Sequence, residues 1–205
     1  AAHAYRQLEA RRDLIRSVVL LGPAHRVYLK GMAVPSVDAF TTPLGDVLID
    51  ADGIRRAQEV PGMQVSDEAH ANEHFLEVHL PFLQSVLDDF LLIPIAVGVC
   101  TARHVEAVLD VLWGGDETAI VISSDLSHFH PYTEAREIDA NTTARIEARE
   151  TNLHGEDACG ANALNGLMLA ARARGLNVRT LDVRNSGDTA GDKFRVVGYG
   201  AYALE

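Results

Sequence analysis

Two histidines in this 205-residue sequence stand just after apolar runs that are typical of buried strands. His25 follows the run 18–21 through a rigid Gly-Pro turn, and His128 follows the run 120–122. Ligands of open α/β sheets bind outside the carboxyl ends of the strands, so both side chains can meet in one crevice. An imidazole there can ligate a metal or act as a general acid or base near neutral pH.

Asp125 precedes His128 by three residues. Its carboxylate could orient an imidazole or accept a substrate proton, and it could equally cap the segment that follows. A single histidine after a strand is also what a hydrogen-bonded structural histidine looks like. The pair of histidines favours the functional interpretation, with a pocket built around His25.

The segment that begins at Glu73 carries a second group of polar side chains. On a helix, Glu73 and Glu77 share one face and His74 lies on the adjoining stripe. The H-E-x-x-H order of a zinc-protease helix is absent, so that site is not predicted. A polar helix start with a capping role is the structural alternative. We expect Glu73, His74 and Glu77 to line or brace the pocket without binding a metal.

Cys159 stands at the predicted start of a helix, where the helix dipole acidifies a thiol. It could be a soft metal ligand or a redox-active thiolate, although on spacing alone an inert buried cysteine is the simpler interpretation. With Cys100 as the second of two cysteines, the chain has no disulfide framework. Free thiols predict a reducing, cytoplasmic location.

The elements that must position these residues alternate between apolar runs and helical patterns, which predicts an α/β fold. We expect a single domain with a mixed, mostly parallel central sheet flanked by helices. Helices are expected at 1–12, 51–59, 73–88, 101–113, 132–149 and 160–174, and strands at 15–21, within 32–50, at 91–97, 118–123, 176–184 and 194–204. The strand 118–123 is expected to be central, and Pro94 favours an edge or a bulge for 91–97.

The composition narrows the choice of partners. A net charge of −11 argues against nucleic acid and against an anionic membrane surface. No apolar run approaches the roughly 18 residues of a membrane-spanning helix. With 47% hydrophobic residues, the chain can bury a sizeable core.

Five segments, in this order along the whole chain, carry a family resemblance. They are Gly-Pro-Ala-His-Arg at 22–26, Ser-Val-Asp-Ala-Phe-Thr-Thr-Pro-Leu-Gly at 36–45, Glu-His-Phe-Leu-Glu-Val-His-Leu-Pro-Phe at 73–82, Ser-Ser-Asp-Leu-Ser-His at 123–128 and Ala-Cys-Gly at 158–160. The chain resembles the MEMO family, whose bacterial and archaeal members are also called AmmeMemoRadiSam system protein B. That family is similar in fold to the class III extradiol dioxygenases.

The resemblance implies an iron or copper site with a redox role. By this resemblance His25 and Cys159 match metal ligands, and Asp125 and His128 match residues of the same pocket. His128 would act as an acid or base, or donate a hydrogen bond, positioned by Asp125. His74 and Glu77 match the family's Glu-His-Ser-x-Glu segment, with phenylalanine in place of the usual serine.

The resemblance also implies a departure. Family members have an upstream strand that ends in Pro-His-Ala-Gly and supplies a further ligand histidine, and this sequence begins at the helix that follows. We therefore expect residues 1–205 to form a MEMO-like α/β domain without that strand. The pocket would hold two of three expected ligands. An unpaired sheet edge would be open to association with a partner chain.

Two other functions stay open. The pocket could belong to a non-catalytic module that binds a peptide or a small anionic ligand through His25, His128 and Arg26. Metal-assisted hydrolysis is a third possibility without dedicated sequence support. As an enzyme, the chain would be a metal-dependent oxidoreductase with a dioxygenase-like pocket, as the resemblance implies.

Overall fold

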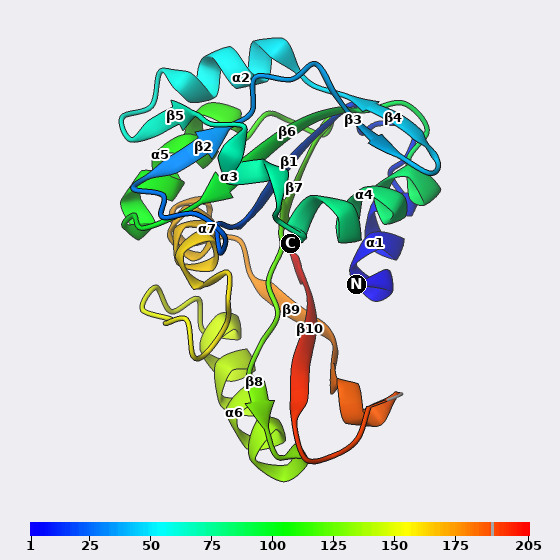
Figure 1. Cartoon of the computed structure of the whole chain (residues 1–205), viewed down its shortest axis with the longest axis vertical. Coiled ribbons are helices and arrows are strands. Elements are labelled where there is room, and N and C mark those ends of the chain that lie inside the picture. The colour runs from blue at the N-terminus through cyan, green and yellow to red at the C-terminus, as the bar shows by residue number, and fades with distance from the viewer. Residues whose placement is uncertain (190) are drawn as a thin grey trace.

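The computed structural model describes residues 1–189 and 191–205. Figure 1 shows a central sheet between helices, with a smaller sheet and a long helix extending from it. The helices are α1 (Ala2–Glu9), α2 (Ala51–Gln58), α3 (Glu68–Ala71), α4 (Phe75–Val86), α5 (Ala102–Leu112), α6 (Tyr132–Glu147), α7 (Ala161–Arg174) and the 3₁₀ turn η1 (Ser186–Asp188). The strands are β1 (Ser17–Pro23), β2 (Met32–Val34), β3 (Ala39–Thr42), β4 (Gly45–Leu48), β5 (Met63–Val65), β6 (Leu91–Val97), β7 (Thr118–Ile122), β8 (His128–His130), β9 (Val178–Asn185) and β10 (Val196–Leu204).

The central sheet has five strands in the order β5-β2-β6-β1-β7. β1 is parallel to both β6 and β7, and β2 is parallel to β5, whereas β2 and β6 are antiparallel. A second, antiparallel sheet has the order β8-β10-β9, and β3 and β4 form a hairpin. The predicted α/β fold with a mixed, mostly parallel central sheet flanked by helices is confirmed.

β1 lies in the middle of two apolar layers. Because successive strand residues point to opposite faces, Val19 and Leu21 join the core with α5 and α7. Val18 and Leu20 join the second core, which α4 covers. All four side chains are fully buried, so β1 holds the loop that carries His25 in a fixed place.

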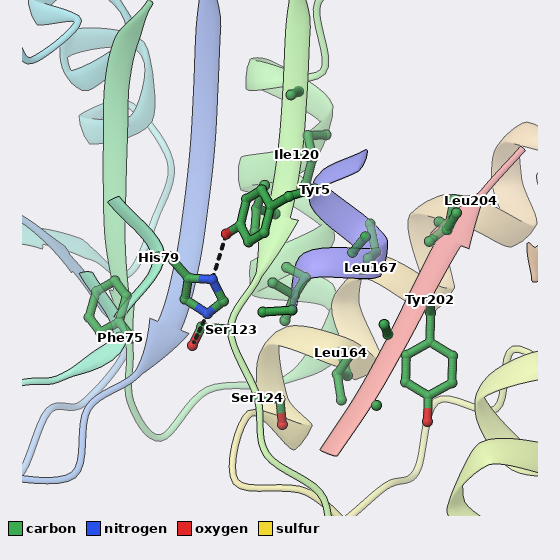
Figure 2. Close-up of a pocket in the computed structure, with 18 of the residues that line it drawn as sticks. Tyr5, Phe75, His79, Ile120, Ser123, Ser124, Leu164, Leu167, Tyr202 and Leu204 are labelled. Carbon is green, nitrogen blue, oxygen red and sulfur yellow. Dashed lines mark hydrogen bonds between the residues drawn. The ribbon is translucent and has the colours of Figure 1, made fainter. Parts of the chain in front are cut away.

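β7 is at the edge of the sheet, so the prediction of a central strand at 118–123 is wrong. Within the described residues it pairs with β1 alone. The apolar run of β7 lines a cavity at this edge, and the other walls of the cavity include apolar side chains (Figure 2). The apolar run in the sequence therefore did not distinguish an edge strand from a central one.

The expectation that Pro94 marks an edge strand or a bulge is also wrong, since β6 lies between β1 and β2. On the side away from β1, β6 meets Ile49 at Leu92 and β2 at Ala96 and Val97. Pro94 lies in the gap between these contacts. A residue without an amide N–H is therefore tolerated inside this strand.

α4 is shorter than the predicted helix 73–88, and its side chains Leu76, Leu80 and Leu83 are buried. Phe82 is different, because 39% of it is exposed and its ring stacks on Tyr5 of α1. Among the described residues, no helix has both the length and the apolar character needed to cross a membrane.

Candidate metal centre

A cavity of about 1710 Å³ extends along the outer side of β7. Its walls include every residue of β7, together with apolar side chains of α7 and β10 such as Leu164, Leu167 and Tyr202 (Figure 2). At the carboxyl end of β7 the lining becomes polar. Asp125 and Cys159 line this polar part of the cavity, and His25 and His128 also belong to the cavity lining.

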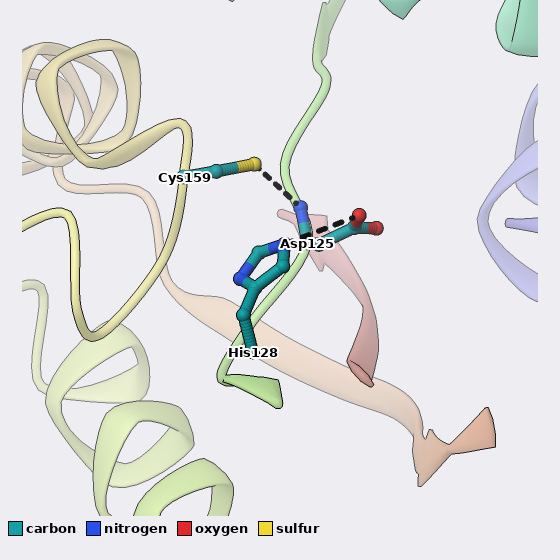
Figure 3. A group of neighbouring side chains, drawn as sticks. All are labelled: Asp125, His128 and Cys159. Atoms are coloured by element: carbon teal, nitrogen blue, oxygen red, sulfur yellow. Dashed lines mark hydrogen bonds and ion pairs between the residues drawn. The ribbon is translucent and has the colours of Figure 1, made fainter. Parts of the chain in front are cut away.

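Asp125, His128 and Cys159 form a compact group at this polar end (Figure 3). One ligand atom from each lies within 4.8 Å of the other two. The distance from His128 Nε2 to Asp125 Oδ2 is 3.7 Å, and the Asp125 amide donates to Cys159 Sγ at 3.1 Å. A carboxylate, an imidazole and a thiol so close together could hold a metal ion.

Hydrogen bonds between the loop after β7 and the loop before α7 place Cys159 beside Asp125. The Ser124 hydroxyl donates to the Asp125 carbonyl at 2.8 Å and accepts from the Gly160 amide at 2.9 Å. A Cβ on Gly160 would lie 2.6 Å from the Ser123 carbonyl oxygen. Only glycine after the cysteine allows this close approach.

His128 belongs to β8, a short strand that the sequence patterns did not indicate. The next residue, Phe129, has a left-handed backbone with a φ of 63°. The Arg195 guanidinium lies 4.9 Å from the centre of the Phe129 ring, and the pairing of β8 with β10 shifts register between Val196 and Val197. Unusual backbone geometry of this kind re-aims neighbouring side chains, here His128.

Burial dominates the electrostatics of the group. It raises the pKa of Asp125, while the nearby His128 and His25 act in the opposite direction. Burial also raises the pKa of Cys159, more than the hydrogen bond from the Asp125 amide lowers it. The acidification expected from the helix dipole is thus outweighed. Two negative charges here would need a cation to offset their desolvation.

His25 lies outside the compact group but lines the same cavity. The buried Glu73 carboxylate accepts hydrogen bonds from the backbone amides of His25 and Arg26, the latter at 2.6 Å. Its second oxygen is 3.3 Å from His25 Nδ1. Glu73 therefore braces the loop after β1 and leaves Nε2 of His25 available.

His74 and Glu77 lie at the rim. His74 lines the cavity, and its Nδ1 hydrogen-bonds to the exposed Glu77 carboxylate. Arg26 donates to His74 Nε2 at 3.2 Å, which links α4 to the loop that carries His25. Of this pair, only His74 faces the cavity.

Sequence reasoning missed a second polar chain in the cavity, formed by Tyr5, His79 and Ser123 (Figure 2). His79 stands within the segment 73–82, and a histidine on the buried side of a helix was an available signal. Tyr5 and Ser123 gave none, because their contact with His79 depends on how α1 and β7 pack.

The fold and the polar group together define an α/β protein with a candidate metal centre at the carboxyl end of its sheet. The sequence matches the profile described as "Memo-like protein" over residues 1–203. The chain belongs to this family, as the resemblance predicted.

Known relatives agree with this membership. The chain is 35% identical to "MEMO1 family protein MK0963" of Methanopyrus kandleri, over 98% of this chain and 76% of that protein. It is 34% identical to a "MEMO1 family protein" of Aeropyrum pernix, with the same coverage. Among solved structures, the uncharacterized protein JW3007 of Escherichia coli K12 is similar, with a TM-score of 0.59 and 13% identity over 97% of this chain and 92% of that chain. The last similarity shows the fold alone.

Proposed function

We propose that this chain is a metal-binding member of its family that holds iron or copper at the carboxyl end of β7 and has a redox role in the cytoplasm. The observation that carries the proposal is the group of Asp125, His128 and Cys159, whose donor atoms lie within 4.8 Å of one another. Thiolate and imidazole donors together suit iron and copper, and the thiolate favours the softer ion.

Cys159 and His25 are the proposed ligands. The contact of His25 Nδ1 with the buried Glu73 carboxylate supports this role, since metal-binding histidines commonly pair their second nitrogen with a carboxylate. When bound, the ion would supply redox chemistry or activation of a small ligand.

Asp125 and His128 have a different proposed role beside the ion. The His128 imidazole would take or give a proton at a ligand, and the Asp125 carboxylate, 3.7 Å from its Nε2, would orient it. Their closeness to the Cys159 thiol supports this assignment.

Metal analysis of protein purified without chelator tests the proposal. Wild-type protein should contain iron or copper, and both His25→Ala and Cys159→Ser should lose most of it. Cys100→Ser is the matched control, because Cys100 lies outside the group and should not affect metal content. Equal metal content in the wild type and in Cys159→Ser would refute the proposal.

A second candidate function rests on the outer edge of β7, which pairs with no strand in the described part of the chain and lies along the cavity. An extended peptide could pair with this edge and fill the apolar walls, in the manner of β-strand addition. A fluorescent peptide of alternating valine and threonine should then bind the wild type, and Ile120→Asp should abolish binding. Equal anisotropy in both proteins would exclude this function.

A further inference from the structure

Three polar residues from distant parts of the chain form one hydrogen-bonded series in the cavity wall. The Tyr5 hydroxyl of α1 is 2.5 Å from Nδ1 of His79 on α4. Nε2 of the same imidazole is 2.9 Å from the hydroxyl of Ser123, the first residue after β7 (Figure 2). Tyr5 is 4% exposed and Ser123 is 8% exposed. The series therefore connects two nearly buried hydroxyl groups through one ring.

All three groups are neutral at physiological pH. Burial raises the pKa of the Tyr5 phenol above its usual range, and burial lowers the pKa of His79 to about 4. A neutral imidazole has one N–H donor and one acceptor nitrogen. The series therefore has three mobile protons, of which two make the internal hydrogen bonds and one points outward.

These three protons can be arranged in two ways. In one, Tyr5 donates to Nδ1, the Nε2–H donates to Ser123, and the serine hydrogen points outward. In the other, Ser123 donates to Nε2, the Nδ1–H donates to Tyr5, and the phenol hydrogen points outward. Exchange between them releases one proton at one end and takes up one at the other, without separation of charge.

The phenol that contacts Nδ1 of His79 argues against a role of Ser123 as a nucleophile. In serine hydrolases a carboxylate accepts from Nδ1 and stabilises the imidazolium that forms. Here a neutral phenol occupies that place, and the imidazole resists protonation. Neutral proton transfer through the ring suits these residues better than activation of Ser123 as a nucleophile.

We infer that Tyr5, His79 and Ser123 form a proton relay that opens at the candidate metal centre. Ser123 is two residues from Asp125 and lines the same cavity. A ligand oxygen at the centre would accept the serine proton. The Nε2 proton would then pass to Ser123 and the phenol proton to Nδ1, while the Tyr5 oxygen takes a proton from water. The negative charge of the ligand oxygen thereby ends as hydroxide, which leaves to the solvent. Delivery of a proton to a ligand at the metal centre presupposes the proposed function.

The test measures exchange of the Tyr5 hydroxyl proton with water by NMR in metal-free protein. The proton should give a low-field resonance that disappears in Tyr5→Phe. Removal of the outer hydroxyl in Ser123→Ala should slow its exchange about fivefold, the factor that corresponds to one neutral hydrogen bond of about 1 kcal/mol. Ser123→Thr should restore the wild-type rate, because it restores the hydroxyl.

A purely structural hydrogen bond gives the opposite result. Loosening the contact in Ser123→Ala would then leave exchange unchanged or make it faster, and this would overturn the relay. Ser85→Ala, on the outer side of α4, is the matched control and should have no effect. Because no metal is present, failure here leaves the metal-binding proposal untouched.

Discussion

His79 should make the protein lose stability as the pH falls from 6.5 to 4. Burial lowers the pKa of His79 from 6.5 to about 4 in the folded state, whereas the unfolded chain keeps the ordinary value. Between pH 6.5 and pH 4, His79 is therefore protonated in the unfolded state and remains neutral in the folded state. Stability is fully present above pH 6.5, declines through this window and levels off below pH 4.

The size of the effect follows from the shift. Each unit of pKa difference corresponds to about 1.4 kcal/mol, so His79 should cost about 2 kcal/mol at pH 5 and about 3 kcal/mol at pH 4. His70 is also buried with a lowered pKa, and it contributes in the same direction. The difference in stability between the wild type and His79→Gln is free of the His70 contribution, since both proteins contain His70.

Urea unfolding at several pH values provides the assay. Trp113 is the single tryptophan and reports unfolding by fluorescence. His79→Gln should be less stable than the wild type at pH 7, because it loses the hydrogen bond with Tyr5. The difference should shrink by about 2 kcal/mol on going to pH 5. Parallel pH profiles for the two proteins would refute the assignment of a buried neutral imidazole.

Three substitutions test how the site is built. Glu73→Gln should weaken metal binding about tenfold or more in a competition titration, since it removes the charge that orients His25; unchanged affinity would argue against His25 as a ligand. Phe129→Gly should be more stable than Phe129→Ala by about 1 kcal/mol in urea, because glycine tolerates a left-handed backbone; equal stability would contradict the strain. Gly22→Ala should lose about 3 kcal/mol in the same assay, since its Cβ would overlap the Phe75 ring; a small loss would show that α4 shifts easily.

The sequence predicted the parts of the site that lie at strand ends. His25 follows β1, whose apolar run 18–21 is fully buried, and the run before Asp125 is β7. Short-range apolar patterns therefore indicated where chemistry could lie. Carboxyl ends of parallel strands meet at one edge of a sheet, which explains why these residues share a cavity.

Other features depend on packing between distant segments and could not be predicted from local patterns. The strand order puts β7 at the edge, and an apolar run looks the same at an edge that faces a cavity lined by apolar side chains. The contact of Tyr5 with His79 requires α1 to lie against α4. The raised pKa of Cys159 reflects burial that its position before a helix does not reveal.

Titration of the metal-free protein with Cu(II), followed by absorption spectroscopy, tests the central claim most directly. Coordination by the Cys159 thiolate should produce a sulfur-to-copper charge-transfer band at one equivalent of metal. The band should persist in Cys100→Ser and vanish in Cys159→Ser. A band of equal strength in Cys159→Ser, or no band in the wild type, would contradict a metal centre built on this cysteine.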